Sequence, residues 1–350
     1  MQIIHSDDTK RRQAQTELSG GQLVAPFECP ERVDYVLASL RERAIGPIEG
    51  PAAHGLEPVR AIHDTAYIDF LTHAWDDWVA AGFEGEAIAS AWPTRRMRDD
   101  IVPRHIDGRI GFYALTGETS IEAQTFDAAR VSADIALTSY EHVRTTGAPA
   151  FGLCRPPGHH AAVDQFGGYC FFNNAAIVAQ RALDDGASRV AILDVDFHHG
   201  NGTQDIFYAR DDVLFVSLHG DPADEFPYFL GYADERGVGA GSGYNVNYPL
   251  APGTGYDEWA AALDDALERI GDYGPDLLIV SLGVDTYKKD PISSFKLDSD
   301  DFTDCGRRIA AAGRPTLFLM EGGYAVAEIG VNVANVLAGF DRATARRAES

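Results

Sequence analysis

The sequence predicts an α/β fold: a single domain in which a central, mostly parallel β-sheet is flanked by helices on both faces. From about residue 149 onward, short apolar runs alternate with helical stretches, and this alternation is typical of a parallel sheet with helices on both sides. The chain has 350 residues with 45% hydrophobic content, which suits one large core. No segment of linker composition divides it. We therefore expect one domain over residues 1–350, with the active site at the carboxyl ends of the strands.

Each element follows from a local pattern. In the first 148 residues the sequence predicts a short strand at 3–4 and helices at 30–43, 67–80 and 121–145. Later strands are expected at 150–154, 190–196, 213–218, 277–282 and 316–320. Further helices are expected at 174–183, 257–270 and 300–312. The pattern weakens over residues 85–119, where we expect a long loop excursion of the kind that usually serves binding or assembly.

The charge balance narrows the choice of partners. The chain has 29 basic and 53 acidic residues, which gives a formal net charge of −24. This argues against nucleic acid or an anionic membrane as a partner, and it suits either a cationic substrate or solubility alone. No apolar run reaches 18 residues and the N-terminus lacks a signal-peptide pattern, so we expect a cytoplasmic protein. The four cysteines form no Cys-x-x-Cys pair and are expected to be reduced thiols.

Acidic residues and histidines gather where the predicted strands end. In the run that starts at residue 190, alternation places Asp194, Asp196 and His198 on one face. Asp285 follows the run at 277–282. Asp196, His198 and Asp285 together make a three-ligand set with an open position for water or substrate, as in catalytic zinc sites. One imidazole with two carboxylates also suits Fe²⁺, Co²⁺ or Mn²⁺.

Three further residues have side chains that suit catalysis. His159 and His160 follow Pro-Pro-Gly, which forms a rigid turn after the run at 150–154. Adjacent histidines can serve as a base for water and as an acid for a leaving group. Tyr324 follows two glycines after the run at 316–320, and its phenol is expected to donate a hydrogen bond to a developing oxyanion. We therefore predict one shared catalytic site at this rim of the sheet.

Six segments resemble the motifs of one family. They are Arg-Pro-Pro-Gly-His-His from residue 155, Gly-Gly-Tyr-Cys-Phe-Phe-Asn-Asn from 167, Asp-Val-Asp-Phe-His-His-Gly-Asn-Gly-Thr from 194, Ser-Leu-His-Gly-Asp-Pro from 217, Ser-Leu-Gly-Val-Asp-Thr from 281 and Met-Glu-Gly-Gly-Tyr from 320. With them the chain resembles the zinc-dependent deacetylases related to histone deacetylases, within the arginase–deacetylase superfamily. Among these it is most similar to the bacterial acetylpolyamine amidohydrolases. The resemblance covers nearly the whole chain and implies the arginase/deacetylase fold.

The resemblance implies roles for individual residues. Zn²⁺, one per chain, would be bound by Asp196, His198 and Asp285, while His159 and His160 would transfer protons and Tyr324 would polarise the substrate carbonyl. One or two structural K⁺ sites are also implied. The first matches Asp194, Asp196, His198, Ser217 and Leu218, and the second matches Phe207, Arg210, Val213 and Tyr244.

Two residues behind the histidines bear on how the proton transfers are divided. The resemblance implies that Asp194 also orients His159. Asn201 stands where many histone deacetylases have an aspartate behind the second histidine. Because a neutral partner supports an imidazolium less well than a carboxylate does, the division of roles between His159 and His160 stays open.

The resemblance also implies a substrate class: N-acetylated polyamines of the acetylputrescine, acetylcadaverine and acetylspermidine type, hydrolysed to acetate and free amine. Tyr169 and Phe226 are expected to form apolar walls for an alkyl chain. The residues implied to contact distal ammonium groups are Glu17, Asp107 and Glu118. The long loop would form a homodimer and narrow the entrance, which would exclude folded proteins.

Three alternative functions share part of this pattern. A protein-lysine deacetylase uses the same chemistry, so the motifs do not separate it from a polyamine enzyme. An arginase-like ureohydrolase with two Mn²⁺ ions needs further carboxylates that bridge the metals, and a binding protein without activity predicts a missing catalytic group. The long loop and the acidic balance favour a small cationic substrate.

Overall fold

The fold is built on one parallel β-sheet of eight strands. In the computed structural model, which describes residues 1–348, the strands lie in the order β4-β1-β5-β10-β9-β6-β7-β8. Every neighbouring pair is parallel. The strands are β1 (Gln2–Ile4), β4 (Ile48–Glu49), β5 (Ala150–Gly152), β6 (Val190–Asp194), β7 (Val213–Gly220), β8 (Asn245–Leu250), β9 (Leu277–Leu282) and β10 (Thr316–Met320). The predicted α/β fold is confirmed.

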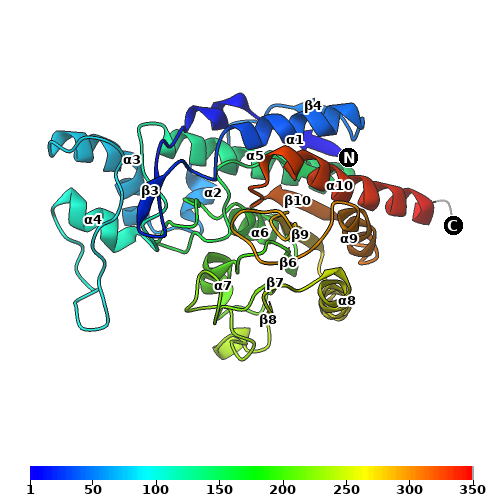
Figure 1. Ribbon diagram of the computed structural model, residues 1–350. Coiled ribbons are helices and arrows are strands. Elements are labelled where there is room, and N and C mark those ends of the chain that lie inside the picture. The colour runs from blue at the N-terminus through cyan, green and yellow to red at the C-terminus, as the bar shows by residue number, and fades with distance from the viewer. Residues whose placement is uncertain (349–350) are drawn as a thin grey trace.

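Helices cover both faces of this sheet (Figure 1). Successive residues of a central strand point to opposite faces: Val190 and Ile192 of β6 join one apolar core, and Ala191 and Leu193 join the other. The helices that close the first core are α2 (Glu57–Arg60), α3 (Thr65–Ala80), α4 (Ile106–Tyr113), α5 (Thr125–Thr146) and α6 (Asn174–Asp184). Those that close the second core are α1 (Glu31–Glu42), α8 (Tyr256–Tyr273), α9 (Asp301–Ala310) and α10 (Val326–Ala348). Burial on both faces explains why the sequences of the central strands are continuous apolar runs.

The predicted central elements are confirmed, and the differences fall at their ends and at the sheet edges. Strand β6 ends at Asp194, so the residues after it lie in a loop rather than on the strand. The prediction left out the edge strands β4 and β8; β8 contains two asparagines and Pro249, a composition that suits an edge. It also left out α10, whose Gly330 and Gly339 weaken helical propensity but let the helix pack closely on the backbones of α1 and α9.

Residues 85–119 form the expected excursion, but with a helix inside it. Helix α4 packs into the first core through Ile106 and Ile110, so this part has regular structure. The loop before α4 projects from the body of the molecule (Figure 1), and Met97, Ile101 and Val102 in it are exposed. The remaining elements are an antiparallel hairpin of β2 (Glu17–Ser19) and β3 (Gln22–Val24), helix α7 (Asn201–Phe207) and two 3₁₀ turns at Asp7–Arg11 and Gly239–Gly241. None of the helices within residues 1–348 has both the length and the apolar character needed to cross a membrane.

Candidate active site

The carboxyl ends of four neighbouring strands supply the predicted site residues. In chain order these are His159 and His160 after β5, Asp196 and His198 after β6, Asp285 after β9 and Tyr324 after β10. Because the four strands are parallel and adjacent in the sheet, their ends meet at one edge. All six residues are buried, with exposed fractions of at most 8%. The structure therefore brings together residues that lie up to 165 positions apart in the sequence (159 to 324).

Asp196, His198 and Asp285 converge with the geometry of a metal site. One potential ligand atom from each lies within 4.8 Å of the other two. His198 Nδ1 lies 3.3 Å from Asp196 Oδ1 and 3.1 Å from Asp285 Oδ2. Ligands bound at about 2.0–2.2 Å around a tetrahedral zinc ion lie roughly 3.3–3.6 Å from one another. The three donors therefore fit such an ion after a small outward movement.

The local electrostatics also favour a cation at this position. Burial, together with the negative charge of Asp196, raises the pKa of Asp285 to about 7. The outer carboxylate oxygens are held by backbone amides: Gly322 N donates to Asp196 Oδ2 at 2.7 Å, and Phe197 N donates to Asp285 Oδ1 at 2.8 Å. A Cβ at Gly322 would collide with both carboxylates, so glycine is required there. These contacts orient the inner oxygens toward one point, as the outer partners of metal ligands do.

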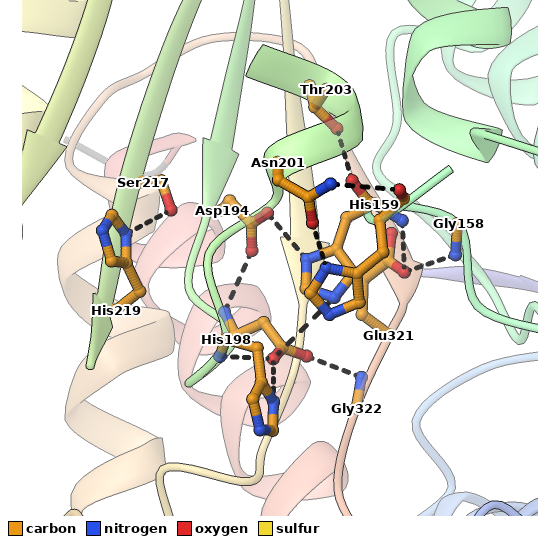
Figure 2. Close-up of polar contacts among 12 residues, drawn as sticks. Gly158, His159, Asp194, His198, Asn201, Thr203, Ser217, His219, Glu321 and Gly322 are labelled. Carbon is orange, nitrogen blue, oxygen red and sulfur yellow. Dashed lines mark hydrogen bonds and ion pairs between the residues drawn. The ribbon is translucent and has the colours of Figure 1, made fainter. Parts of the chain in front are cut away.

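The two histidines differ in partner and in charge. His159 Nδ1 donates to Asp194 Oδ2 at 2.9 Å (Figure 2). His160 Nδ1 donates to Asn201 Oδ1 at 2.7 Å. Burial opposes protonation of both rings, but the charges of Asp194 and Asp196 raise the pKa of His159 to about 10. Burial and repulsion from His159 lower the pKa of His160. This difference favours a protonated His159 beside a neutral His160.

Glu321 is a buried carboxylate whose role sequence reasoning missed. Its Oε2 accepts hydrogen bonds from the backbone N of Gly158 (2.7 Å) and of His159 (3.2 Å), as Figure 2 shows. It therefore fixes the turn that carries both histidines. The available signal was its position directly after the buried strand β10, within a motif from which only Tyr324 was selected.

Tyr324 is held as a protonated phenol beside the site. Asp290 Oδ2 accepts hydrogen bonds from the backbone N of Tyr324 (2.7 Å) and of Ala325 (3.0 Å). The Arg32 guanidinium lies over the tyrosine ring at 4.9 Å from its centroid, and Arg32 Nε donates to Gly323 O at 2.8 Å. Burial raises the pKa of the Tyr324 hydroxyl well above its usual range. The phenol is therefore a hydrogen-bond donor at neutral pH.

A pocket of about 300 Å³ gives access to these residues. His160, His198 and Tyr324 line it, together with the predicted walls Tyr169 and Phe226. The Phe226 ring lies 5.1 Å from that of His160, and the Tyr169 ring lies 5.5 Å from that of Tyr324, centroid to centroid. Two aromatic side chains therefore flank the access to the catalytic candidates.

Two of the three carboxylates expected to bind ammonium groups line this pocket. Glu17 and Glu118 do so, and no lysine or arginine is found among the described residues that line it. Asp107 lies outside the pocket, in the first turn of α4, and accepts a hydrogen bond from Ser90 Oγ at 3.2 Å. Within a single chain, Glu17 and Glu118 are therefore placed to face a substrate in the pocket, and Asp107 is not.

The first K⁺ site is expected at Asp194, Ser217 and Leu218 together with the metal ligands Asp196 and His198. Asp194 on β6 and Ser217 on β7 are paired in register, and Leu218 follows on β7. Ser217 Oγ lies 2.8 Å from His219 Nδ1 (Figure 2). His199, which follows the expected ligand His198 in the sequence, is buried against His219 with 4.5 Å between ring centroids. It thus packs away from the three ligands.

The residues expected at the second K⁺ site lie around the start of β7. Arg210 N donates to Phe207 O at 2.9 Å, and β7 begins at Val213. Tyr244 O accepts a hydrogen bond from Phe215 N at 2.9 Å. The four residues therefore share one neighbourhood, apart from the catalytic candidates.

The fold and this arrangement together define a hydrolase of the deacetylase class. A histone deacetylase domain model matches residues 26–340, and the chain belongs to this family. Acetylpolyamine amidohydrolase 1 of Pseudomonas aeruginosa is 56% identical over 344 residues, which covers 98% of this chain and 99% of the relative. The acetylpolyamine amidohydrolase of Mycoplana ramosa is 56% identical over 339 residues, with 97% and 99% coverage.

A solved structure agrees with these relatives. The crystal structure of an acetylpolyamine aminohydrolase from Burkholderia pseudomallei is similar with a TM-score of 0.92 and 38% identity, and the match covers 98% of this chain and 99% of that one. The resemblance expected from the six motifs is therefore confirmed for the family and for the fold.

Proposed function

We propose that this protein is a zinc-dependent amidohydrolase that removes the acetyl group from N-acetylated polyamines and releases acetate and the free amine. One observation carries the proposal. The ligand triad, the histidine pair and Tyr324 converge at a pocket that is lined by carboxylates and, among the described residues, by no lysine or arginine. The names of two relatives that are 56% identical to this chain support the polyamine substrate class.

The metal would be held by Asp196, His198 and Asp285. A Zn²⁺ ion bound there would act as a Lewis acid that polarises the acetyl carbonyl and lowers the pKa of a water molecule towards about 7. The family is generally zinc-dependent, and the donor set also suits Fe²⁺ or Co²⁺. The preference for zinc is part of this proposal.

The side chains divide the proton transfers and the charge stabilisation. Neutral His160 accepts the proton of the attacking water, because its lowered pKa keeps a ring nitrogen free. His159, charged and held by Asp194, provides the proton for the leaving amine nitrogen. Tyr324 donates a hydrogen bond to the carbonyl oxygen as negative charge develops on it.

The pocket selects a thin, cationic substrate. Tyr169 and Phe226 offer apolar surface to the alkyl chain, and the carboxylates of Glu17 and Glu118 make the entrance negative. The loop before α4 exposes the apolar side chains Met97, Ile101 and Val102, a surface that suits a homodimer contact. Such a contact would narrow the entrance further.

K⁺ is proposed at the two sites around β7. The oxygen atoms of Asp194, Asp196, His198, Ser217 and Leu218 would hold the first ion, and those of Phe207, Arg210, Val213 and Tyr244 would hold the second. Carbonyl and other oxygen ligands suit K⁺. The first ion would stiffen the loop after β6, which carries Asp196 and His198.

A steady-state survey with metal-defined enzyme tests the function. The zinc-loaded chain is expected to hydrolyse acetylputrescine, acetylcadaverine and acetylspermidine with a higher kcat/KM than an acetyl-lysine peptide. The reverse preference would favour the protein-lysine deacetylase, which uses the same catalytic groups. Metal analysis is expected to give one transition-metal ion per chain. Two ions per chain, with turnover of a guanidine substrate, would favour the arginase-like alternative.

A further inference from the structure

Three carboxylates line the substrate pocket. They differ in how many hydrogen bonds they already accept from other groups of the protein. Both oxygens of Glu17 accept hydrogen bonds, Oε2 from Phe27 N at 3.0 Å and Oε1 from the Tyr169 hydroxyl at 3.2 Å. One oxygen of Glu118, Oε1, accepts from Gly168 N at 3.0 Å and from the Thr116 hydroxyl. Glu17 in particular is 2% exposed and acts as an internal brace for the pocket wall.

Glu225 is the third carboxylate, and it has no such partner. It comes from the loop after β7, on a different element from Glu17 and Glu118, and directly precedes the wall residue Phe226. Within residues 1–348, its side chain takes part in no hydrogen bond or ion pair. Its two oxygens are therefore both available to a ligand in the pocket.

The position of Glu225 is nevertheless fixed by its backbone hydrogen bonds and by the packing of its Cγ atom. Its N donates to Asp221 O at 2.9 Å, and its O accepts from Tyr228 N at 3.0 Å. Its Cγ lies over Gly220, where an added Cβ would come within 2.9 Å of it and within 2.8 Å of the Phe197 ring. A held carboxylate without a protein partner loses little conformational entropy when it binds a cation.

We propose that Glu225 is the specificity-determining carboxylate that binds the distal ammonium group of the acetylated polyamine, while Glu17 positions Tyr169 and the Phe27 loop. This inference rests on the proposed function. The pocket places Glu225 beside the Phe226 wall, so the alkyl chain that passes this wall brings its ammonium end to the carboxylate. Both oxygens of Glu17 already accept hydrogen bonds, so Glu17 supports the pocket wall and does not bind the ammonium group directly.

The test compares a cationic amide with a neutral one of the same length. Acetylputrescine and N-pentylacetamide share the acetamide and a chain of equal length, but only the first carries a distal ammonium group. In Glu225→Gln, the ratio of their kcat/KM values is expected to fall about tenfold, chiefly through KM for acetylputrescine. A tenfold change corresponds to the binding free energy that one hydrogen bond to a charged group contributes at a partly exposed position.

Three further variants separate ammonium binding from other effects. Asp224→Asn removes the same charge from the neighbouring exposed residue outside the pocket, and its ratio is expected to stay within twofold of the wild type. Glu17→Gln is expected to lower kcat/KM for both amides together, because it loosens a wall that both substrates contact. Thermal unfolding of each variant checks that it folds, and Glu225→Asp, which keeps the charge, is expected to keep most of the ratio.

The outcomes are distinguishable. Equal ratios in Glu225→Gln and wild type would overturn the inference while leaving the proposed function intact. A tenfold fall in Asp224→Asn as well would also overturn it, because the effect would then come from net charge. If the wild type hydrolyses neither amide and no acetylpolyamine, the proposed function fails and the inference fails with it.

Discussion

Two buried clusters of charged side chains in this molecule are neutralised in opposite ways. Around Glu28, three arginines surround one carboxylate, with Arg155 Nε at 2.8 Å, Arg32 Nη1 at 3.1 Å and Arg12 Nη1 at 3.5 Å. Backbone carbonyls take up the surplus of positive charge; Arg155 Nη1, for example, donates to Thr9 O at 2.6 Å. At the candidate metal site, by contrast, carboxylates outnumber the cations that face them. Protein groups alone balance the charges of the Glu28 cluster. The candidate metal site has an excess of negative charge that a bound cation would balance.

The pKa values express this difference. Burial opposes ionisation of Glu28, but the charges of Arg155, Arg32 and Arg12 lower its pKa to about 2. Burial and a neighbouring carboxylate raise the pKa of Asp285 to about 7. Equal burial thus accompanies opposite shifts for these two carboxyl groups, because arginines surround Glu28 whereas another carboxylate faces Asp285. Arg32 bonds Glu28 and also lies over the Tyr324 ring, so the Glu28 cluster borders the candidate active site.

The largest expected effect comes from removing a metal ligand. Asp285→Asn is expected to lower kcat by about 10³ or more, because the Lewis acid is worth several kcal/mol. If the cluster is incomplete without a cation, the same substitution should not destabilise the metal-free protein, since it removes a repelling charge. Urea unfolding of chelator-treated wild type and variant measures this. A marked loss of stability in the metal-free variant would contradict the comparison.

The equivalent change in the self-contained cluster should act on stability instead. Glu28→Gln leaves three buried guanidinium groups without their carboxylate, which is expected to lower the free energy of unfolding by about 3–5 kcal/mol. Chemical denaturation with and without added zinc provides the measurement. Added metal should not restore the loss, whereas it should stabilise the wild type by mass action. Full recovery with zinc would show that the two clusters are not independent in this way.

How much the sequence predicted depends on how the residues are distributed along the chain. The zinc ligands, both histidines and Tyr324 each follow a buried strand, so a parallel sheet brings them together once the strands are recognised. The Glu28 cluster was not predicted, because its members at 12, 28, 32 and 155 share no periodic pattern and meet only through tertiary contacts.

Two other differences have physical causes. The sequence prediction applied the alternation of strand side chains as far as His198, but β6 ends at Asp194. Beyond that point the ligands are positioned by hydrogen bonds from loop amides, such as the bond from Asp196 N to Asp194 Oδ1. Asp107 was expected at the pocket, yet helix α4 holds it outside in a single chain. The sequence does not single out Glu225, because the pattern around a glutamate in a loop is the same whether or not its carboxylate has a hydrogen-bond partner in the fold.

Removing the phenol of Tyr324 should affect turnover but neither cluster. Tyr324→Phe keeps the ring under Arg32 and loses only the hydroxyl, so folding and metal content are expected to be normal. Loss of one donor to a developing oxyanion typically lowers kcat by about 10²–10³. Steady-state kinetics with metal analysis of the same preparation tests this. Near-normal turnover would remove Tyr324 from the mechanism.

The smallest predicted effect is the acid response of the Glu28 cluster. Glu28 has its pKa lowered from 4.5 to about 2 on folding, so its ionised form stabilises the folded state above pH 4.5. That stability, about 3 kcal/mol in full, is lost as the pH falls from 4.5 through 2. Glutamine does not titrate, so the stability gap between the metal-free wild type and Glu28→Gln should shrink by about 1–2 kcal/mol between pH 6 and pH 3.5. Urea titrations at these two pH values measure the gap, and the other carboxylates cancel because both proteins contain them. A gap that widens on acidification would mean that the arginines do not hold Glu28 ionised, and the contrast with Asp285 would then be lost.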